Sequence, residues 1–129
     1  HPVLGGGTAA LALAVLAYEA SRLRSGGQSV GPMDAVRLMN QDALLLDVRE
    51  TNEFEQGRLP NALHIPLSQL AGRIGEVKGK HDLPVIVYCA SGRRSRMAGA
   101  TLAKAGFKDI YHLTGGIAAW RGAGLPVEK

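Results

Sequence analysis

The residue in this sequence best placed to do chemistry is its single cysteine, Cys89. It follows the apolar run 84–88 and precedes a turn that contains Gly92. The loop from Cys89 to Arg94 can direct backbone N–H groups inward, as an anion-binding nest does. A helix expected from about Ser95 adds the positive end of its dipole. Such surroundings lower the pKa of a thiol and favour the thiolate, which is its nucleophilic form.

Arginines follow the cysteine closely. Arg94 ends the loop and is predicted to bind an oxyanion, because a guanidinium group matches oxyanions in shape and charge. Arg93 is predicted to face solvent at the mouth of the site, and Arg96 to be a charge on the helix surface. The alternative for Cys89 is a structural role, since a free cysteine often serves as a small core residue. The Gly-Arg-Arg turn that follows favours a reactive site.

Composition limits the classes of function. The chain has 129 residues, which suits one compact domain and an appendage. One cysteine excludes an internal disulfide and argues against a cysteine-based zinc site, and the four histidines are scattered. We therefore predict no metal and no other cofactor. The net charge of +4 is mild and few aromatic residues accompany it, so no nucleic-acid partner is predicted.

The first part of the chain differs from the rest. Residues 3–18 carry no charge, and Arg22 follows them. The run approaches the ~20 residues of a membrane-spanning helix. We therefore predict a membrane anchor and flexible joint over residues 1–26, with the joint at "SGGQS" (25–29), and a separate domain over residues 27–129. A buried helix and a signal peptide are the alternatives. Basic residues after the run place the domain in the cytoplasm, where thiols stay reduced.

The domain alternates strand and helix patterns, which predicts a parallel sheet between helices. Strands are expected over 43–48, 62–66, 84–88 and 109–113. Helices are expected over 31–40, 50–57, 68–77 with Ser68 as N-cap, 95–106 and 115–124. The expected fold is a single α/β domain with roughly five mostly parallel strands, helices on both faces, and an apolar helix in front. Ligands of such folds bind beyond the carboxyl ends of strands, which is where Cys89 lies.

Three segments, in this order, resemble the rhodanese-like sulfurtransferases: "DVRETNEFEQGRLPNALHIP", "VIVYCASGRRS" and "LTGGIAAW". The resemblance covers about residues 28–127. With the apolar run in front, the chain is similar to the small membrane-attached rhodanese proteins of bacteria, which implies the bacterial inner membrane. Where that family usually has Gly-His-Ile, this chain has Gly57, Arg58 and Leu59. That region shapes the fold more than the chemistry.

The resemblance implies the roles of the site residues. Cys89 is the catalytic residue and carries the sulfur as a persulfide. The substrate-binding residues it implies are Ala90, Ser91, Gly92, Arg93 and Arg94, and the supporting residues are Asp47, Arg49 and Ser95. The implied partners are a sulfur donor such as thiosulfate, whose sulfonate Arg94 is expected to bind, and a thiol or cyanide acceptor. The oligomeric state stays open.

Two other functions remain possible on the same scaffold. A cysteine phosphatase or arsenate reductase needs an arginine six positions after the cysteine, where this chain has Ser95. Arg94 comes one position early, so the loop is expected to enclose a smaller anion, such as a sulfane sulfur. The second of these alternatives is a non-catalytic, membrane-anchored interaction module. The presence of Cys89 argues against it.

Overall fold

A computed structural model of the protein describes residues 14, 27–78 and 82–129. The predicted anchor, residues 3–18, lies outside the described residues except for Ala14. Within the described ranges, no helix is both long enough and apolar enough to cross a membrane.

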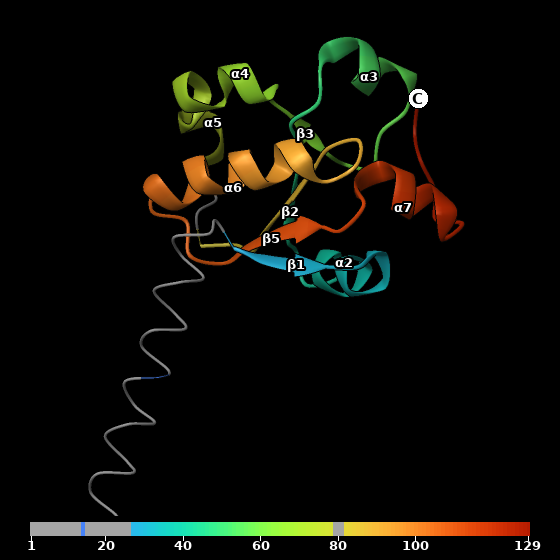
Figure 1. Ribbon diagram of the computed structural model, residues 1–129, viewed down its shortest axis with the longest axis horizontal. Helices are drawn as coiled ribbons and strands as arrows, with labels where there is room; N and C mark the ends of the chain where they lie inside the picture. Colours follow the sequence, from blue (N-terminus) through green and yellow to red (C-terminus); the bar gives the residue numbers. More distant parts are fainter. Residues whose placement is uncertain (1–13, 15–26, 79–81) are drawn as a thin grey trace, which may run out of the picture.

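The domain is built on a five-stranded sheet with the order β1-β5-β4-β2-β3 (Figure 1). The strands are β1 Gln28–Val30, β2 Leu44–Asp47, β3 Leu63–His64, β4 Val85–Tyr88 and β5 Ile110–Leu113. All neighbouring strands run parallel. Strand β4 and the first three residues of β2 are continuous apolar runs, as expected where a parallel sheet is covered on both faces. The expected α/β fold with a parallel sheet is therefore confirmed.

Strand β1 corrects the predicted flexible joint at its last residues, Gln28 and Ser29, which are paired in the sheet. Gln28 pairs with Tyr111 of β5, and the N–H of Thr114 donates to the Val30 carbonyl over 2.8 Å. Gly27 has a positive φ of 117°, and a Cβ there would overlap the backbone of β5. This short polar edge strand has no hydrophobic alternation to reveal it. Backbone pairing with β5 defines it.

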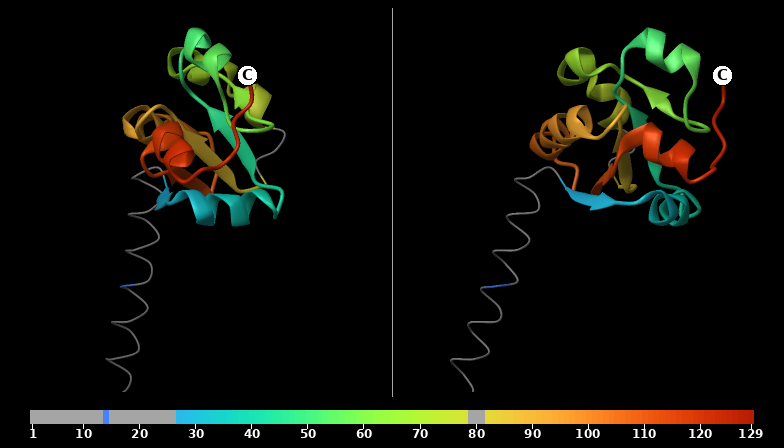
Figure 2. Two further views of the ribbon diagram at one scale, coloured as in Figure 1. Left: turned by 90° about the vertical axis from the view of Figure 1, so that its right-hand side faces the viewer. Right: turned by 45° about the vertical axis from the view of Figure 1, so that its right-hand side comes forward.

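Helices cover both faces of the sheet (Figures 1 and 2). They are α2 Pro32–Met39, α3 Thr51–Gln56, α4 Leu67–Leu70, α5 Gly75–Lys78, α6 Arg93–Lys104, α7 Gly116–Gly122 and the 3-10 helix η1 Ala71–Arg73. The continuous helix expected over 68–77 is wrong, because the segment is divided into α4, η1 and α5. Gly72 and Gly75 lie where it breaks, and glycine disfavours a helix interior. Ser68 is not the N-cap, since Pro66 holds that position.

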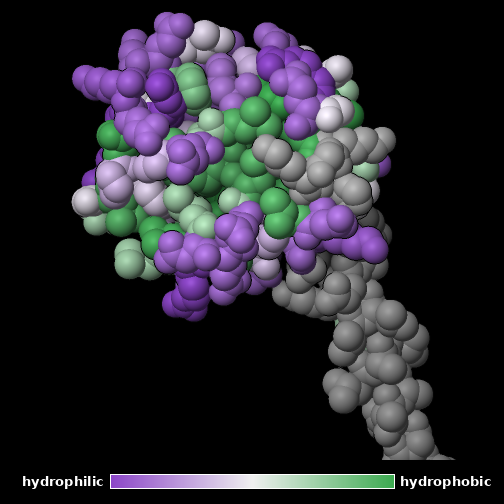
Figure 3. Space-filling view, turned by 180° about the vertical axis from the view of Figure 1, so that it is seen from behind, coloured by the Kyte–Doolittle hydropathy of each residue, from purple (hydrophilic) through white to green (hydrophobic). Residues whose placement is uncertain are grey.

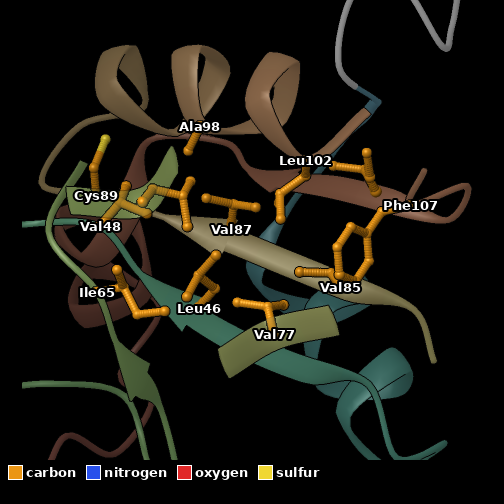
Figure 4. Packing of buried hydrophobic residues seen from close by; sticks show 12 residues of the cluster. Leu46, Val48, Ile65, Val77, Val85, Val87, Cys89, Ala98, Leu102 and Phe107 are labelled. Atoms are coloured by element: carbon orange, nitrogen blue, oxygen red, sulfur yellow. The ribbon is translucent and has the colours of Figure 1, made fainter. Parts of the chain in front are cut away.

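Alternating residues of β4 form two hydrophobic cores. Val85 and Val87 pack with Leu102 of α6 on one face, and Ile86 packs with Trp120 of α7 on the other. Figure 4 shows the first core, with the Cys89 sulfur at the end of the strand near the start of α6. Seen from behind, the domain has hydrophobic residues near the middle of that face and hydrophilic ones around them (Figure 3). The two cores fix β4, and with it the position of the cysteine that follows.

Candidate active site

The candidate catalytic loop, which follows Cys89, joins β4 to α6 at the carboxyl edge of the sheet. Helix α6 begins at Arg93, two positions earlier than expected. Gly92 is its N-cap and has φ of 115°, a left-handed conformation that glycine adopts without a steric penalty. Arg93 and Arg94 therefore belong to the first turn of α6. The loop proper is the short stretch 90–92.

The Cys89 thiol lies inside this loop and is surrounded by hydrogen-bond donors. The residue is only 1% exposed, and the Gly92 N–H donates to its Sγ over 3.0 Å. Burial raises the pKa of the Cys89 thiol. Hydrogen bonds from the backbone N–H groups of Ser95, Gly92 and Ser91 outweigh burial and lower that pKa. The loop therefore favours a thiolate.

Ser95 occupies the position where a cysteine phosphatase has its arginine. It is fully buried, and its hydroxyl donates to the Gly92 carbonyl over 2.9 Å. The side chain thus closes the loop internally and also lies beside the thiol. The structure brings Ser95 into the site as close support for Cys89.

The start of α7 holds the loop from the other side. The Ile117 N–H donates to the Cys89 carbonyl over 2.9 Å. Gly116 has φ of 60°, and a Cβ there would overlap the backbone of Cys89 and Ala90. Only glycine allows this close approach of two backbones. Gly116 was not among the predicted site residues, although the Gly-Gly pair directly before an apolar segment was a signal for it.

Asp47 and Arg49 form a buried ion pair at the end of β2. The Arg49 Nη2 lies 2.8 Å from the Asp47 Oδ2 and donates to the Gly57 carbonyl over 2.6 Å. Burial, and then the Asp47 carboxylate, raise the pKa of the Tyr88 hydroxyl, which accepts a hydrogen bond from the Leu59 N–H over 3.1 Å. These contacts tie β2 and β4 to the segment after α3. They hold the strand ends beneath the loop.

Arg94 is held by a partner that the sequence analysis did not identify. Its Nη1 and Nη2 donate to the two carboxylate oxygens of Glu53 in α3 over 2.6 and 2.9 Å. The pKa of Glu53 is lowered to about 2, mainly by the hydrogen bond with Arg94 and also by the Glu50 N–H, while burial opposes the shift. The pair joins α3 to the first turn of α6. Binding of a sulfonate by Arg94 stays a prediction.

A pocket of about 370 Å³ opens beside the loop. Ser91 and Gly92 form one wall, and His112 at the end of β5 forms part of another. Arg93 lines the pocket, and so does Arg96, which was expected only on the helix surface.

Within the described ranges, no group of three or more His, Cys, Asp or Glu residues could hold a metal ion.

A cysteine of lowered pKa thus lies among hydrogen-bond donors in a loop between a parallel strand and a helix, an arrangement that suits a nucleophilic thiol. Residues 32–123 match the family described as Rhodanese-like domain, and the chain belongs to that family. The uncharacterized protein YibN of Escherichia coli (strain K12) is 33% identical over 131 residues, covering 100% of this chain and 92% of YibN.

Two further comparisons place the chain within this family. The thiosulfate sulfurtransferase GlpE of Pseudomonas savastanoi pv. phaseolicola (strain 1448A / Race 6) is 35% identical over 92 residues, which are 71% of this chain and 85% of GlpE. The crystal structure of a rhodanese-related protein from Thermoplasma volcanium superposes with a TM-score of 0.71 at 32% identity. It covers 78% of this chain and 97% of that one. The family includes proteins named as sulfurtransferases.

Proposed function

We propose that this protein is a sulfurtransferase that carries sulfane sulfur on Cys89. The observation that carries the proposal is the loop of N–H donors around a thiol of lowered pKa. The same donors that stabilise a thiolate also stabilise the negative charge of a persulfide. The sulfurtransferase activity named for GlpE supports the same chemistry.

The proposed reaction has two halves. The Cys89 thiolate attacks the outer sulfur of thiosulfate, a new S–S bond forms, and sulfite leaves with the electron pair of the broken S–S bond. The thiolate of an acceptor then attacks the outer sulfur of the Cys89 persulfide, and the electron pair returns to Cys89. This is covalent nucleophilic catalysis. The mechanism invokes no separate general base, because the loop itself lowers the pKa of the attacking thiol.

The structure offers less support for the alternatives. A phosphatase clamp needs a cation where this chain has the buried Ser95, and the neighbouring Arg94 is neutralised by Glu53. A passive interaction module has no use for a thiol whose pKa is lowered by the loop. Sulfur transfer is the function that uses this geometry.

Mass spectrometry after thiosulfate treatment tests the proposal. The protein should gain one sulfur atom, and cyanide should remove it. Cys89 packs in the core beneath α6, so Cys89→Ser is the control that best keeps its volume. Cys89→Ser should keep the circular dichroism spectrum and gain no sulfur. A sulfur gain by this variant would overturn the mechanism.

We also propose that residues 3–18 attach the domain to the bacterial inner membrane, with the catalytic part on the cytoplasmic side. The uncharged run and the arginines after it support this orientation. The full chain should sediment with membranes and resist high salt, because salt does not screen apolar burial. Deleting residues 1–25 keeps β1 and should release an active domain. Release of the full chain by salt alone would contradict the anchor.

A further inference from the structure

The pocket beside the catalytic loop lies next to the reactive sulfur without containing it. Gly92 lines the pocket, and its N–H also donates to the Cys89 Sγ over 3.0 Å. One peptide unit of the loop therefore separates the pocket from the sulfur. A molecule that fills the pocket can place a group a few bonds away against Cys89.

The pocket is electrostatically unlike its surroundings. Arg93 and Arg96 line it from one face of α6, three positions apart, and no carboxylate lines it. Within the described parts of the chain neither arginine has an ion-pair partner, whereas Arg94 between them is paired with Glu53. Unneutralised guanidinium groups around a concave surface attract an anion.

The rest of the lining combines polar side chains with Leu113 and the backbone of two glycines. Ser29, Ser91 and Thr114 provide hydroxyl groups, and His112 provides an imidazole that is only 5% exposed. Hydroxyls and guanidinium groups together suit a carboxylate, which accepts several hydrogen bonds at once. The lining therefore favours a carboxylate through hydrogen bonds as well as through charge.

Thiosulfate does not account for this pocket. Its sulfonate is bonded directly to the sulfur that reacts, so in the attack on Cys89 the sulfonate stays at the loop. The pocket of about 370 Å³ lies one peptide unit away and has room for a larger group. It fits an anion that is several bonds from the reacting sulfur.

We propose that this pocket binds the carboxylate of the sulfur acceptor, a low-molecular-weight thiol whose carboxylate lies several bonds from its sulfur. The proposal rests on the proposed sulfurtransferase function. In the transfer, the acceptor thiolate forms a bond to the outer sulfur of the persulfide, the bond from that sulfur to Cys89 breaks, and Cys89 recovers its thiolate. Arg93 and Arg96 hold the far end of the acceptor during this step.

The test compares thiols that carry a carboxylate with uncharged thiols of equal length. The full chain is loaded with thiosulfate, and sulfur transfer is timed with 6-mercaptohexanoate and 6-mercaptohexanol at equal thiolate concentration. The acid should react faster, and the acid-to-alcohol rate ratio should exceed that of 3-mercaptopropionate to 3-mercaptopropanol. Arg96→Gln should lower the ratio about three- to fivefold, the size of one surface ion pair.

Lys104→Gln is the matched control, because it removes one charge from the other end of α6. It should leave the ratio unchanged. An equal drop in Lys104→Gln would show that net charge alone favours the acid, and would overturn the pocket. A larger acid advantage for the shorter thiol would place the anion at the loop itself and would also overturn it.

Binding separates this inference from the proposed function. Calorimetric titration of the Cys89→Ser full chain with 6-(methylthio)hexanoate needs no sulfur transfer. Binding that Arg96→Gln weakens supports the pocket even if thiosulfate fails to load Cys89. Absence of binding overturns the pocket while leaving persulfide formation intact.

Discussion

Two arginine–carboxylate pairs lie near the carboxyl edge of the sheet, and they differ mainly in burial. The Asp47–Arg49 pair has a closest contact of 2.8 Å, with side chains 0% and 5% exposed. The Glu53–Arg94 pair has a closest contact of 2.6 Å, with both side chains 30% exposed. The two ion pairs therefore have similar contact distances, but one lies in the protein interior and the other is partly exposed to water.

The difference in burial assigns the two pairs different tasks. Removing one partner of a buried pair leaves a charge that water cannot solvate, so breaking the buried pair destabilises the folded state. A partly exposed pair contributes little to stability because water can replace either partner. The pKa of Arg94 is raised first by Glu53 and more weakly by the Cys89 thiolate, so the exposed pair acts on the field at the sulfur.

Breaking the buried pair should have the largest effect. Arg49→Met leaves the Asp47 carboxylate without its partner, and we expect the free energy of unfolding to fall by about 3–5 kcal/mol. Urea denaturation followed by circular dichroism measures it. Arg37→Met removes an exposed arginine of α2 and should change stability by less than about 0.5 kcal/mol. Equal losses of stability in the two variants would show that burial of the Asp47–Arg49 pair does not make it more important to stability.

Breaking the exposed pair should change reactivity more than stability. Glu53→Gln leaves the Arg94 charge uncompensated near the thiolate, so the pKa of Cys89 should fall further. Arg94→Gln should raise that pKa. The pH dependence of the iodoacetamide reaction rate measures both, and unfolding should change by about 1 kcal/mol or less in each. Shifts in the same direction would show that the pair does not act on Cys89 electrostatically.

The smallest effect concerns acid stability. The pKa of Glu53 is about 2 in the folded protein, against an ordinary value of about 4.3. A lowered pKa gives stability that is full above the unfolded value and is lost as pH falls toward the folded value. The protein should therefore lose up to about 1 kcal/mol between roughly pH 4.5 and 2 from this group. The loss should be smaller in Glu53→Gln, as urea midpoints across that range would show. An identical pH dependence in both proteins would refute the assignment.

The sequence by itself determined the elements whose signals are local. Apolar runs predicted β2 and β4, and Gly92 indicated the turn after Cys89, where its backbone is left-handed. The prediction of a reactive thiol followed from its position after a buried strand. These features depend on neighbouring residues, so a single stretch of sequence contains them.

Only the tertiary structure decided the contacts between distant segments. Strand β1 exists through pairing with β5, and Arg94 meets Glu53 across 41 positions of sequence. Gly116 is needed because the start of α7 touches the loop that follows Cys89, and Arg96 lines a pocket because β5 ends opposite it. Each of these depends on where two separate segments come to lie after packing. Neither periodicity nor local composition reveals such contacts in the sequence. Backbone pairing and ion pairing leave no repeating pattern in either of the two segments that they join.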